Sequence, residues 1–150
     1  MRRIITTLIV YSIMFLLMLA FARYAHAAEL NQVDCLAKTV YFEAGNQSTK
    51  GKTAVAYVTM NRVFSNGWPS TVCAVVYQHG QYGWTTLNKT IQKNYAWYVS
   101  RRIALLVYKE YNVLKDPTHG ATYYCRLTEH LKLNRVKKRT VIGGHVFYKV

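Results

Sequence analysis

Residues 38–62, KTVYFEAGNQSTKGKTAVAYVTMNR, decide the fold of this chain because two helical patterns meet in them at a glycine. The first pattern ends at Ala44, and its stripe of apolar residues consists of Val33, Leu36, Ala37, Val40 and Ala44. Glu43 shares the side of the helix that carries Val33, Leu36, Ala37 and Val40. Gly45 follows Glu43 by two residues, where a left-handed cap is expected to end the helix.

This position gives the Glu43 side chain the properties of a general acid. The apolar stripe removes part of the carboxyl group from water, and the end of the helix places it near the negative end of the helix dipole. Both effects favour the protonated form, which can donate a proton to a substrate. The alternative is an ordinary solvated glutamate in a last helical turn.

Spacing and capping residues predict mainly helical structure in the rest of the chain. The first helix is expected over residues 33–44 after Asn31, and the second over 50–64 with Ser48 or Thr49 as its N-cap. Ser70 is expected to cap a short helix, and a long amphipathic helix is predicted over 94–114. Residues 121–124 and 140–150 have strand character.

The first 27 residues have the pattern of a secretory signal. Arg2 and Arg3 precede an uncharged run from Ile4 to Ala22, and Ala25-His26-Ala27 supplies the small residues of a cleavage site. We therefore expect residues 1–27 to be a signal peptide or signal anchor and residues 28–150 to be one domain. The run of 19 residues is just long enough to span a bilayer, so a retained anchor is the alternative to cleavage.

Basic residues outnumber acidic ones by 20 to 6, which gives a formal net charge of +14. Without Arg2, Arg3 and Arg23 the remaining chain carries 17 basic residues against the same 6 acids, or +11. Such a balance predicts a polyanionic partner. Export favours cell-wall polymers and anionic membrane over nucleic acid, and the basic run 132–139 is expected to be a solvated surface that adds to this attraction.

The cysteines and histidines leave several interpretations open. Cys35, Cys73 and Cys125 allow at most one internal disulfide in an oxidising compartment, and the sequence alone does not choose the pair. A zinc site for amidase chemistry could draw on Cys125 and the histidines, but no spacing matches a zinc motif, so no metal and no cofactor are expected. The histidines of the domain are His79, His119, His130 and His145.

A glycine-punctuated loop, residues 79–84, carries two aromatic side chains. Tyr82 and Trp84 are expected either to stack on the face of a sugar or to pack into the core. Trp97, inside the predicted long helix, is expected to belong to the core.

Several motifs occur in order over nearly all of the predicted domain. They read Tyr41-Phe-Glu43-Ala, Gly51-Lys-Thr-Ala54-Val-Ala56, Asn61-Arg62-Val63, Trp68-Pro69-Ser-Thr-Val-Cys73-Ala-Val-Val76, Gln81-Tyr82-Gly83-Trp84, Asp116-Pro-Thr-His-Gly-Ala-Thr-Tyr-Tyr and Gly143-Gly-His145-Val-Phe-Tyr. With these motifs, residues 35–87 and 116–148 resemble the SleB/CwlJ-type cell-wall hydrolase family, the spore-cortex-lytic-like peptidoglycan hydrolase domain.

The resemblance implies a mainly α (α+β) fold, in which a compact lysozyme-like helical domain carries a small C-terminal sheet of two or three strands. It implies peptidoglycan as substrate, Glu43 as the catalytic acid, and a disulfide between Cys35 and Cys73 that leaves Cys125 outside the bridge. The residues expected to contact substrate are Gln81, Tyr82, Trp84, Asn61 and His145.

These observations predict an exported lytic transglycosylase that cleaves the bond between N-acetylmuramic acid and N-acetylglucosamine with one glutamate. Ordinary glycoside hydrolysis uses two carboxylates, and acids are few here, although Asp116 or Glu129 could provide a second group. The alternatives are a hydrolysing muramidase, an N-acetylmuramoyl-L-alanine amidase, and a non-catalytic basic module that binds cell wall or nucleic acid. We expect a monomer in the periplasm or cell wall, tethered to the membrane if the N-terminal segment is retained; a phage lysis role and a bacterial remodelling or germination role suit the sequence equally.

Overall fold

A computed structural model of the chain describes residues 2–87, 89–128 and 139–149. The chain forms two compact units, Met1–Asn31 and Gln32–Val150. Helix α1 (Arg2–Ala44) contributes its first part to the first unit and its last turns to the second.

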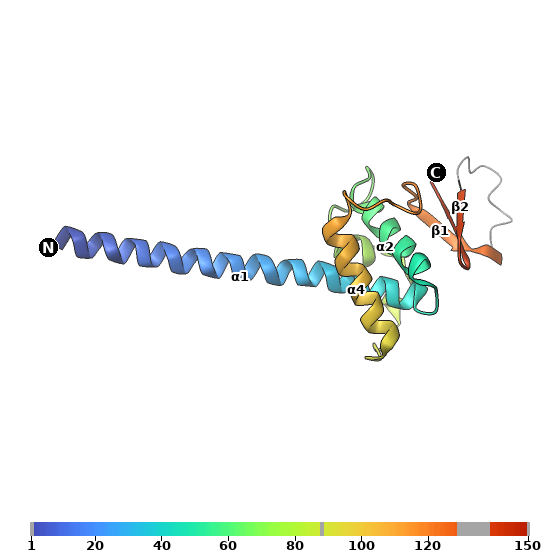
Figure 1. Ribbon diagram of the computed structural model, residues 1–150, viewed down its shortest axis with the longest axis horizontal. Helices are drawn as coiled ribbons and strands as arrows, with labels where there is room; N and C mark the ends of the chain where they lie inside the picture. Colours follow the sequence, from blue (N-terminus) through green and yellow to red (C-terminus); the bar gives the residue numbers. More distant parts are fainter. Residues whose placement is uncertain (1, 88, 129–138, 150) are drawn as a thin grey trace. The chain divides into compact units, whose positions relative to one another are not determined.

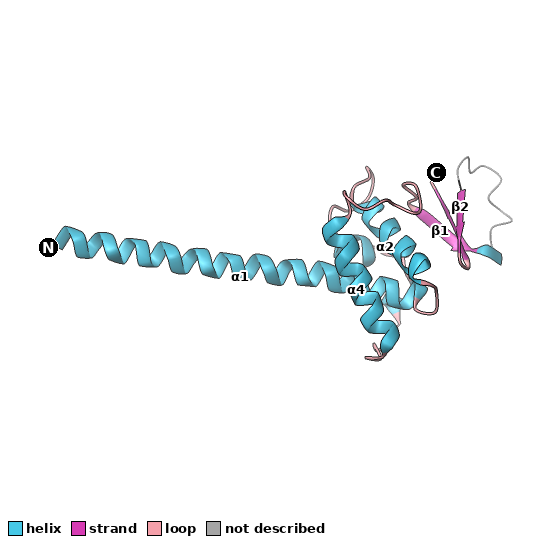
Figure 2. Ribbon diagram, in the orientation of Figure 1, coloured by secondary structure: helices cyan, strands magenta, loops and turns pink. Residues whose placement is uncertain are grey.

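The second unit also contains four shorter helices and three strands within the described residues (Figures 1 and 2). The elements that follow α1 are α2 (Thr49–Val63), α3 (Val72–Val76), the 3₁₀ helix η1 (Gly83–Thr86), α4 (Tyr95–Glu110), β1 (Tyr123–Arg126), β2 (Arg139–Ile142) and β3 (His145–Tyr148). The predicted fold class, mainly helical with a small C-terminal sheet, is confirmed.

The first unit consists of the N-terminal part of α1. The segment Thr7–Ala44 is long and apolar enough to cross a membrane, a property that signal sequences near an N-terminus share. The prediction that a separate helix begins after Asn31 is wrong, because α1 runs through this residue without a break. Residues 25–37 contain neither glycine nor proline and are rich in alanine and leucine, so nothing in them interrupts the helix.

Helix α2 lies at the centre of the second unit. Every residue from Gly51 to Arg62 except Thr53 is buried. The helix lies between α4 and the sheet (Figure 1) and contacts α3, α4 and β2. A helix that is buried on nearly all sides is positioned by the elements around it.

The last turns of α1 pack onto the core through the predicted stripe, whose five residues are at most 3% exposed. A disulfide joins Cys35 of α1 to Cys73 of α3, the pair that the family resemblance implies. The two cysteines are 38 residues apart. In the chain-entropy model a loop of this length stabilises the fold by about 4 kcal/mol.

The starts of α2 and α3 lie at or next to the predicted caps, and α4 starts next to Asn94, where the long helix was predicted to begin. The Ser48 side chain accepts a hydrogen bond from the Gly51 amide at the start of α2. Asn94 caps α4 in the same way. The N-cap of α3 is Thr71, one residue after the predicted Ser70.

Helix α4 ends at Glu110, earlier than the predicted Leu114. Asn112 and Val113 are weak helix formers. In addition, the carbonyl of Leu114 accepts a hydrogen bond from the Tyr57 hydroxyl at 3.0 Å, which fixes the chain in a turn against α2.

The sheet is antiparallel, with strand order β1-β3-β2. Tyr124 lies opposite Phe147, and Tyr123 lies opposite Tyr148. Residues directly opposite each other point to the same face of a sheet. Phe147 is fully buried and packs with Ala44 and residues of α2, so the face that carries Tyr124 is the one that meets the helices.

Candidate active site

Glu43 lies in the last turn of α1, one residue before its end. Gly45 does not have the predicted left-handed conformation, because its φ is not positive. Glycine is needed at this position for another reason. A Cβ here would lie 2.4 Å from the carbonyl oxygen of Tyr41. Glycine is therefore required because the chain leaves the helix in close contact with its own last turn.

The loop that follows Glu43 is held from two sides. The buried ammonium group of Lys52 donates hydrogen bonds to the carbonyls of Gly45 and Gln47, and burial lowers the pKa of Lys52. The Gln47 side chain accepts a hydrogen bond from the Gly144 amide at 3.0 Å. Gly143 has φ 59°, and a Cβ there would lie 2.6 Å from the same Gln47 oxygen. The helix end that carries Glu43 is thus fixed to both α2 and the β2–β3 turn.

Tyr124 of β1 donates a hydrogen bond from its hydroxyl to Glu43 Oε2 at 2.9 Å. Burial raises the pKa of Tyr124 well above its ordinary value, and the neighbouring Tyr82 and Glu43 raise it further, whereas Arg62 lowers it. The phenol therefore remains protonated at neutral pH and is a permanent donor to the Glu43 carboxylate. The contact joins residues 81 positions apart in the sequence.

Arg62 is a buried cation beside this pair. It donates hydrogen bonds to the carbonyl of Thr122 at 2.7 Å and to the Tyr82 hydroxyl at 3.1 Å. Its guanidinium group also lies 4.5 Å from the centre of the Trp68 ring and 5.9 Å from that of Tyr123. Arg62 therefore links α2 to the segment that leads into β1, and it fixes Tyr82.

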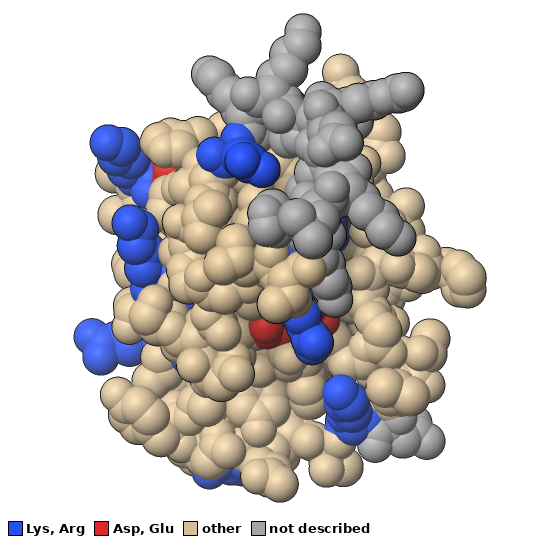
Figure 3. Space-filling model, turned by 90° about the vertical axis from the view of Figure 1, so that its right-hand side faces the viewer, with Lys and Arg blue, Asp and Glu red and all other residues tan. Residues whose placement is uncertain are grey.

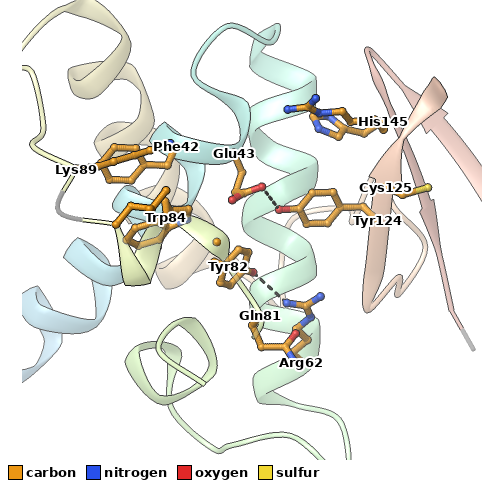
Figure 4. A pocket seen from close by; sticks show the side chains of 13 residues that line it. Phe42, Glu43, Arg62, Gln81, Tyr82, Trp84, Lys89, Tyr124, Cys125 and His145 are labelled. Carbon is orange, nitrogen blue, oxygen red and sulfur yellow. Dashed lines mark hydrogen bonds between the residues drawn. The ribbon is translucent and has the colours of Figure 1, made fainter. Parts of the chain in front are cut away.

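Glu43, Tyr124 and Arg62 line a cavity of about 470 Å³. Figure 4 shows Glu43 in its middle, with Phe42 and Trp84 on one side and Tyr124 on the other. A second cavity, of about 740 Å³, shares Phe42, Glu43, Arg126 and His145 with the first. Because the carboxyl group lies where the two cavities meet, a chain-like ligand can occupy space on both sides of Glu43.

Four of the five predicted substrate contacts line the first cavity: Gln81, Tyr82, Trp84 and His145. Tyr82 and Trp84 are only 3% and 7% exposed. The Tyr82 hydroxyl is bonded to Thr59 and Arg62, and the Trp84 ring stacks on Phe42 with centroids 4.8 Å apart. Of the two roles weighed for these residues, the structure favours packing: they form the wall of the cavity rather than exposed stacking platforms.

The fifth predicted contact, Asn61, lines neither of these cavities. Its side chain is 5% exposed and donates to Asp116 Oδ2 at 3.0 Å and to the carbonyl of Ala121 at 2.9 Å. Its own oxygen accepts a hydrogen bond from the Tyr111 hydroxyl at 2.7 Å. The amide nitrogen and the amide oxygen of Asn61 are thus both hydrogen-bonded inside the protein.

Asp116 and Glu129 were considered as second catalytic groups. Neither is found beside Glu43 among the described residues that line the two cavities. Asp116 accepts hydrogen bonds from the Thr118 and Gly120 amides at 2.7 Å and organises the turn before β1. Glu129 lies outside the described residues, as do His130 and the basic run up to residue 138. Among the residues that the structure describes, Glu43 is the one acid that lines either cavity. The basic residues that line the cavities are Arg62, Lys89 and Arg126.

On the face of the protein shown in Figure 3 most of the described surface is uncharged, and Lys and Arg side chains appear at more places than Asp and Glu. Within the described ranges, no three His, Cys, Asp or Glu side chains lie close enough together to hold a metal ion. The Cys125 side chain points away from Glu43 (Figure 4), as expected for the residue that alternates with Tyr124 on β1.

The buried tyrosines make stability fall in alkali. Burial raises the pKa of Tyr82 and of Tyr124, whereas in the unfolded chain each phenol ionises near about pH 10. Above that pH the unfolded state binds fewer protons than the folded state. The free energy of unfolding is therefore expected to fall by about 1.4 kcal/mol per pH unit for each such tyrosine. Urea unfolding on both sides of about pH 10 measures this slope. Tyr124→Phe should make it shallower, and an unchanged slope would contradict burial of this phenol.

Several residues of the site were not predicted from the sequence: Lys52, Arg62, Lys89, Tyr124 and Arg126. One signal was present for Arg62, because it continues the inward stripe of Ala54, Val55 and Val58 on α2. A charged residue on such a stripe indicates a buried and therefore partnered cation. Tyr124 carried no local signal, since its partner is distant in the sequence.

Comparison with known proteins places these features in a wider context. Residues 46–148 match the Cell Wall Hydrolase family. The catalytic domain of the Bacillus cereus SleB protein is 25% identical with a TM-score of 0.66, over 80% of this chain and 91% of that one. The catalytic domain of the germination-specific lytic transglycosylase SleB from Bacillus anthracis is 26% identical with a TM-score of 0.60, over 79% and 94%. A search among curated proteins gives no significant match.

Proposed function

Because this chain belongs to the cell wall hydrolase family, we propose that it is an exported lytic transglycosylase that cleaves peptidoglycan glycan strands with Glu43 as its catalytic acid. Within the family, this reaction type is the one named for the structurally similar Bacillus anthracis domain. The family match begins at residue 46, just after Glu43. The assignment of Glu43 therefore rests on its position in the fold.

The observation that carries the proposal is that Glu43 is the single acid, among the described residues, at the junction of two cavities. A glycosidase that uses water or an enzyme nucleophile needs a second carboxylate about 5–9.5 Å from the first. A transglycosylase does not, because the substrate supplies its own nucleophile. One carboxyl group with a neutral donor, Tyr124, is sufficient for that reaction.

In the proposed reaction, protonated Glu43 donates its proton to the glycosidic oxygen between N-acetylmuramic acid and N-acetylglucosamine, and the bond to the muramyl C1 breaks. The resulting Glu43 carboxylate then accepts the proton of the muramyl C6 hydroxyl while that oxygen bonds to C1 and closes a 1,6-anhydro ring. Glu43 ends the cycle protonated. The cations Lys89 and Arg126 at the cavity wall suit the carboxylates of stem peptides carried by the glycan.

The products decide between this reaction and its alternatives. The full chain is incubated with purified sacculi in ¹⁸O-labelled water, and the released muropeptides are weighed by mass spectrometry. Anhydro-muramyl ends without ¹⁸O support the proposal. Reducing ends that carry ¹⁸O would mean a hydrolysing muramidase, and freed stem peptides would mean an amidase. Binding to sacculi without any release would mean a non-catalytic wall-binding protein.

Tyr124→Phe is expected to lower kcat about tenfold or more, because it removes a hydrogen bond to a charged group that is worth about 1.5–3 kcal/mol. The carboxylate that Tyr124 stabilises forms only when Glu43 gives up its proton, so the loss should appear in kcat rather than in KM. Initial rates of muropeptide release at several substrate concentrations separate the two. Tyr123→Phe is the matched control, because this neighbour lies on the other face of the sheet. An equal loss in Tyr123→Phe, or a rise of KM with kcat unchanged, would show that Tyr124 does not act through Glu43.

Export completes the proposal. The N-terminal pattern and the apolar helix Thr7–Ala44 support delivery across a membrane, with residues 1–27 removed or kept as an anchor. The disulfide between Cys35 and Cys73 suits an oxidising compartment.

A further inference from the structure

We propose that the outer face of α4 is a docking surface for an anionic phospholipid membrane. This face, the α4 outer stripe, consists of Tyr95, Tyr98, Arg102, Leu105, Leu106 and Lys109. Apart from the neighbours Leu105 and Leu106, these residues follow one another at steps of three or four, so all six lie on one side of the helix. The inference is independent of the reaction catalysed at Glu43.

The stripe lies opposite the side of α4 that packs into the domain. The buried residues of the helix are Trp97, Ser100, Ile103, Ala104 and Val107. Across the helix, Tyr95 is 85% exposed, Tyr98 59% and Leu106 51%. An amphipathic helix packed on a domain normally presents polar residues on its outer side. Here the outer side is apolar and aromatic with interleaved cations, which indicates a surface with a function.

The charged residues around the stripe are almost all basic. Residues 89–115 contain Lys89, Lys93, Arg101, Arg102, Lys109 and Lys115 against the single acid Glu110. Arg101 and Arg102 are both exposed. A partner for this surface must therefore carry negative charge and also accept exposed leucine and tyrosine side chains.

An anionic membrane surface meets both requirements. Leucine side chains insert at the boundary of the acyl chains, tyrosines lie at the level of the headgroups, and arginines and lysines reach lipid phosphates. A glycan offers no apolar phase for Leu105 and Leu106. A second copy of the chain would bring the cations of the stripe against one another. The same chain also contains a helix that is long and apolar enough to cross a membrane.

The effect of charge can be stated in advance. Each Lys or Arg near an anionic membrane contributes about 1 kcal/mol, or about fivefold in binding. Arg101→Glu with Arg102→Glu is therefore expected to lower the ratio of docked to undocked domain about 25-fold or more. The matched control, Lys50→Glu with Lys149→Glu, makes the same change in net charge at exposed positions on α2 and after β3.

The test uses the full chain reconstituted through its own apolar helix. Leu106 is replaced by a polarity-sensitive fluorescent amino acid, and in a second protein Lys50 is replaced instead. Vesicles contain phosphatidylcholine alone or with phosphatidylglycerol, and spin-labelled lipid serves as quencher. We expect a blue shift and quenching at position 106 and not at position 50, only with phosphatidylglycerol, reduced by the arginine pair and retained in the control pair.

Other results would overturn the proposal. A probe at position 106 that stays in water on anionic vesicles means that the stripe does not dock on lipid. Equal quenching on phosphatidylcholine alone means that anionic headgroups are not the partner. A shift that depends on protein concentration without lipid assigns the stripe to self-association, and a shift with purified sacculi alone assigns it to the cell wall.

Discussion

Glu43→Gln is expected to lower the rate of glycan cleavage by about 10²- to 10⁴-fold, the usual contribution of a general acid. Glutamine has nearly the same size, and its amide oxygen can accept the hydrogen bond that Tyr124 donates to Glu43 Oε2. It has no proton of suitable acidity to give to the glycosidic oxygen. Release of muropeptides from sacculi measures the loss, and the free energy of unfolding in urea should stay within about 0.5 kcal/mol of wild type.

Two further variants test whether the loss of activity depends on the position of the Glu43 carboxyl group or only on the loss of a negative charge. Glu110→Gln removes an exposed carboxylate on α4 and should leave the rate unchanged. Glu43→Asp keeps the carboxyl group but draws it back by one methylene, and a misplacement of about 1 Å can cost about 10²-fold. If Glu43→Gln released fragments as fast as wild type, Glu43 would not be the catalytic acid.

The sequence predicted the helices because their signals are local. Ser48 and Asn94 cap helices where their side chains reach amides three residues ahead, and the stripe of α1 follows from spacing alone. The end of α4 was predicted too late, and there a contact from elsewhere in the chain contributes to the difference. The Tyr57 hydroxyl, which binds the Leu114 carbonyl, helps to end α4, and no pattern within 94–114 records that bond.

The candidate site likewise contains residues with a local sequence signal and residues that only the tertiary fold brings together. The sequence indicated Glu43 because its own helix places a carboxyl group at an apolar end. Tyr124 reaches this carboxyl group from a strand, and Arg62 binds Tyr82 in the same cavity from another helix, so their roles depend on the tertiary fold. Gly45 was correctly identified as the end of α1 for an incorrect reason: the need is for close approach to the Tyr41 carbonyl rather than for a positive φ.

Asn61 is a motif residue whose hydrogen bonds favour a role in the fold over the expected contact with substrate. In the resemblance it belongs to the Asn61-Arg62-Val63 motif and was expected to contact substrate. In the structure its amide joins three segments, because it bonds to Asp116, to the carbonyl of Ala121 and to the Tyr111 hydroxyl. Asn61 therefore helps to hold the turn that leads into β1, the strand of Tyr124.

Asn61→Ala is accordingly expected to lower the free energy of unfolding by about 2–4 kcal/mol, since it leaves buried groups without partners at about 1–3 kcal/mol each. Urea unfolding measures this loss. Asn112→Ala, at an exposed position after α4, should change stability by less than about 0.5 kcal/mol. If Asn61 instead bound substrate, its replacement would raise KM for soluble glycan fragments and leave the unfolding curve in place. The structural role predicts the reverse: the fraction of Asn61→Ala that is folded should retain a KM close to wild type, because the amide lies outside both cavities that meet at Glu43.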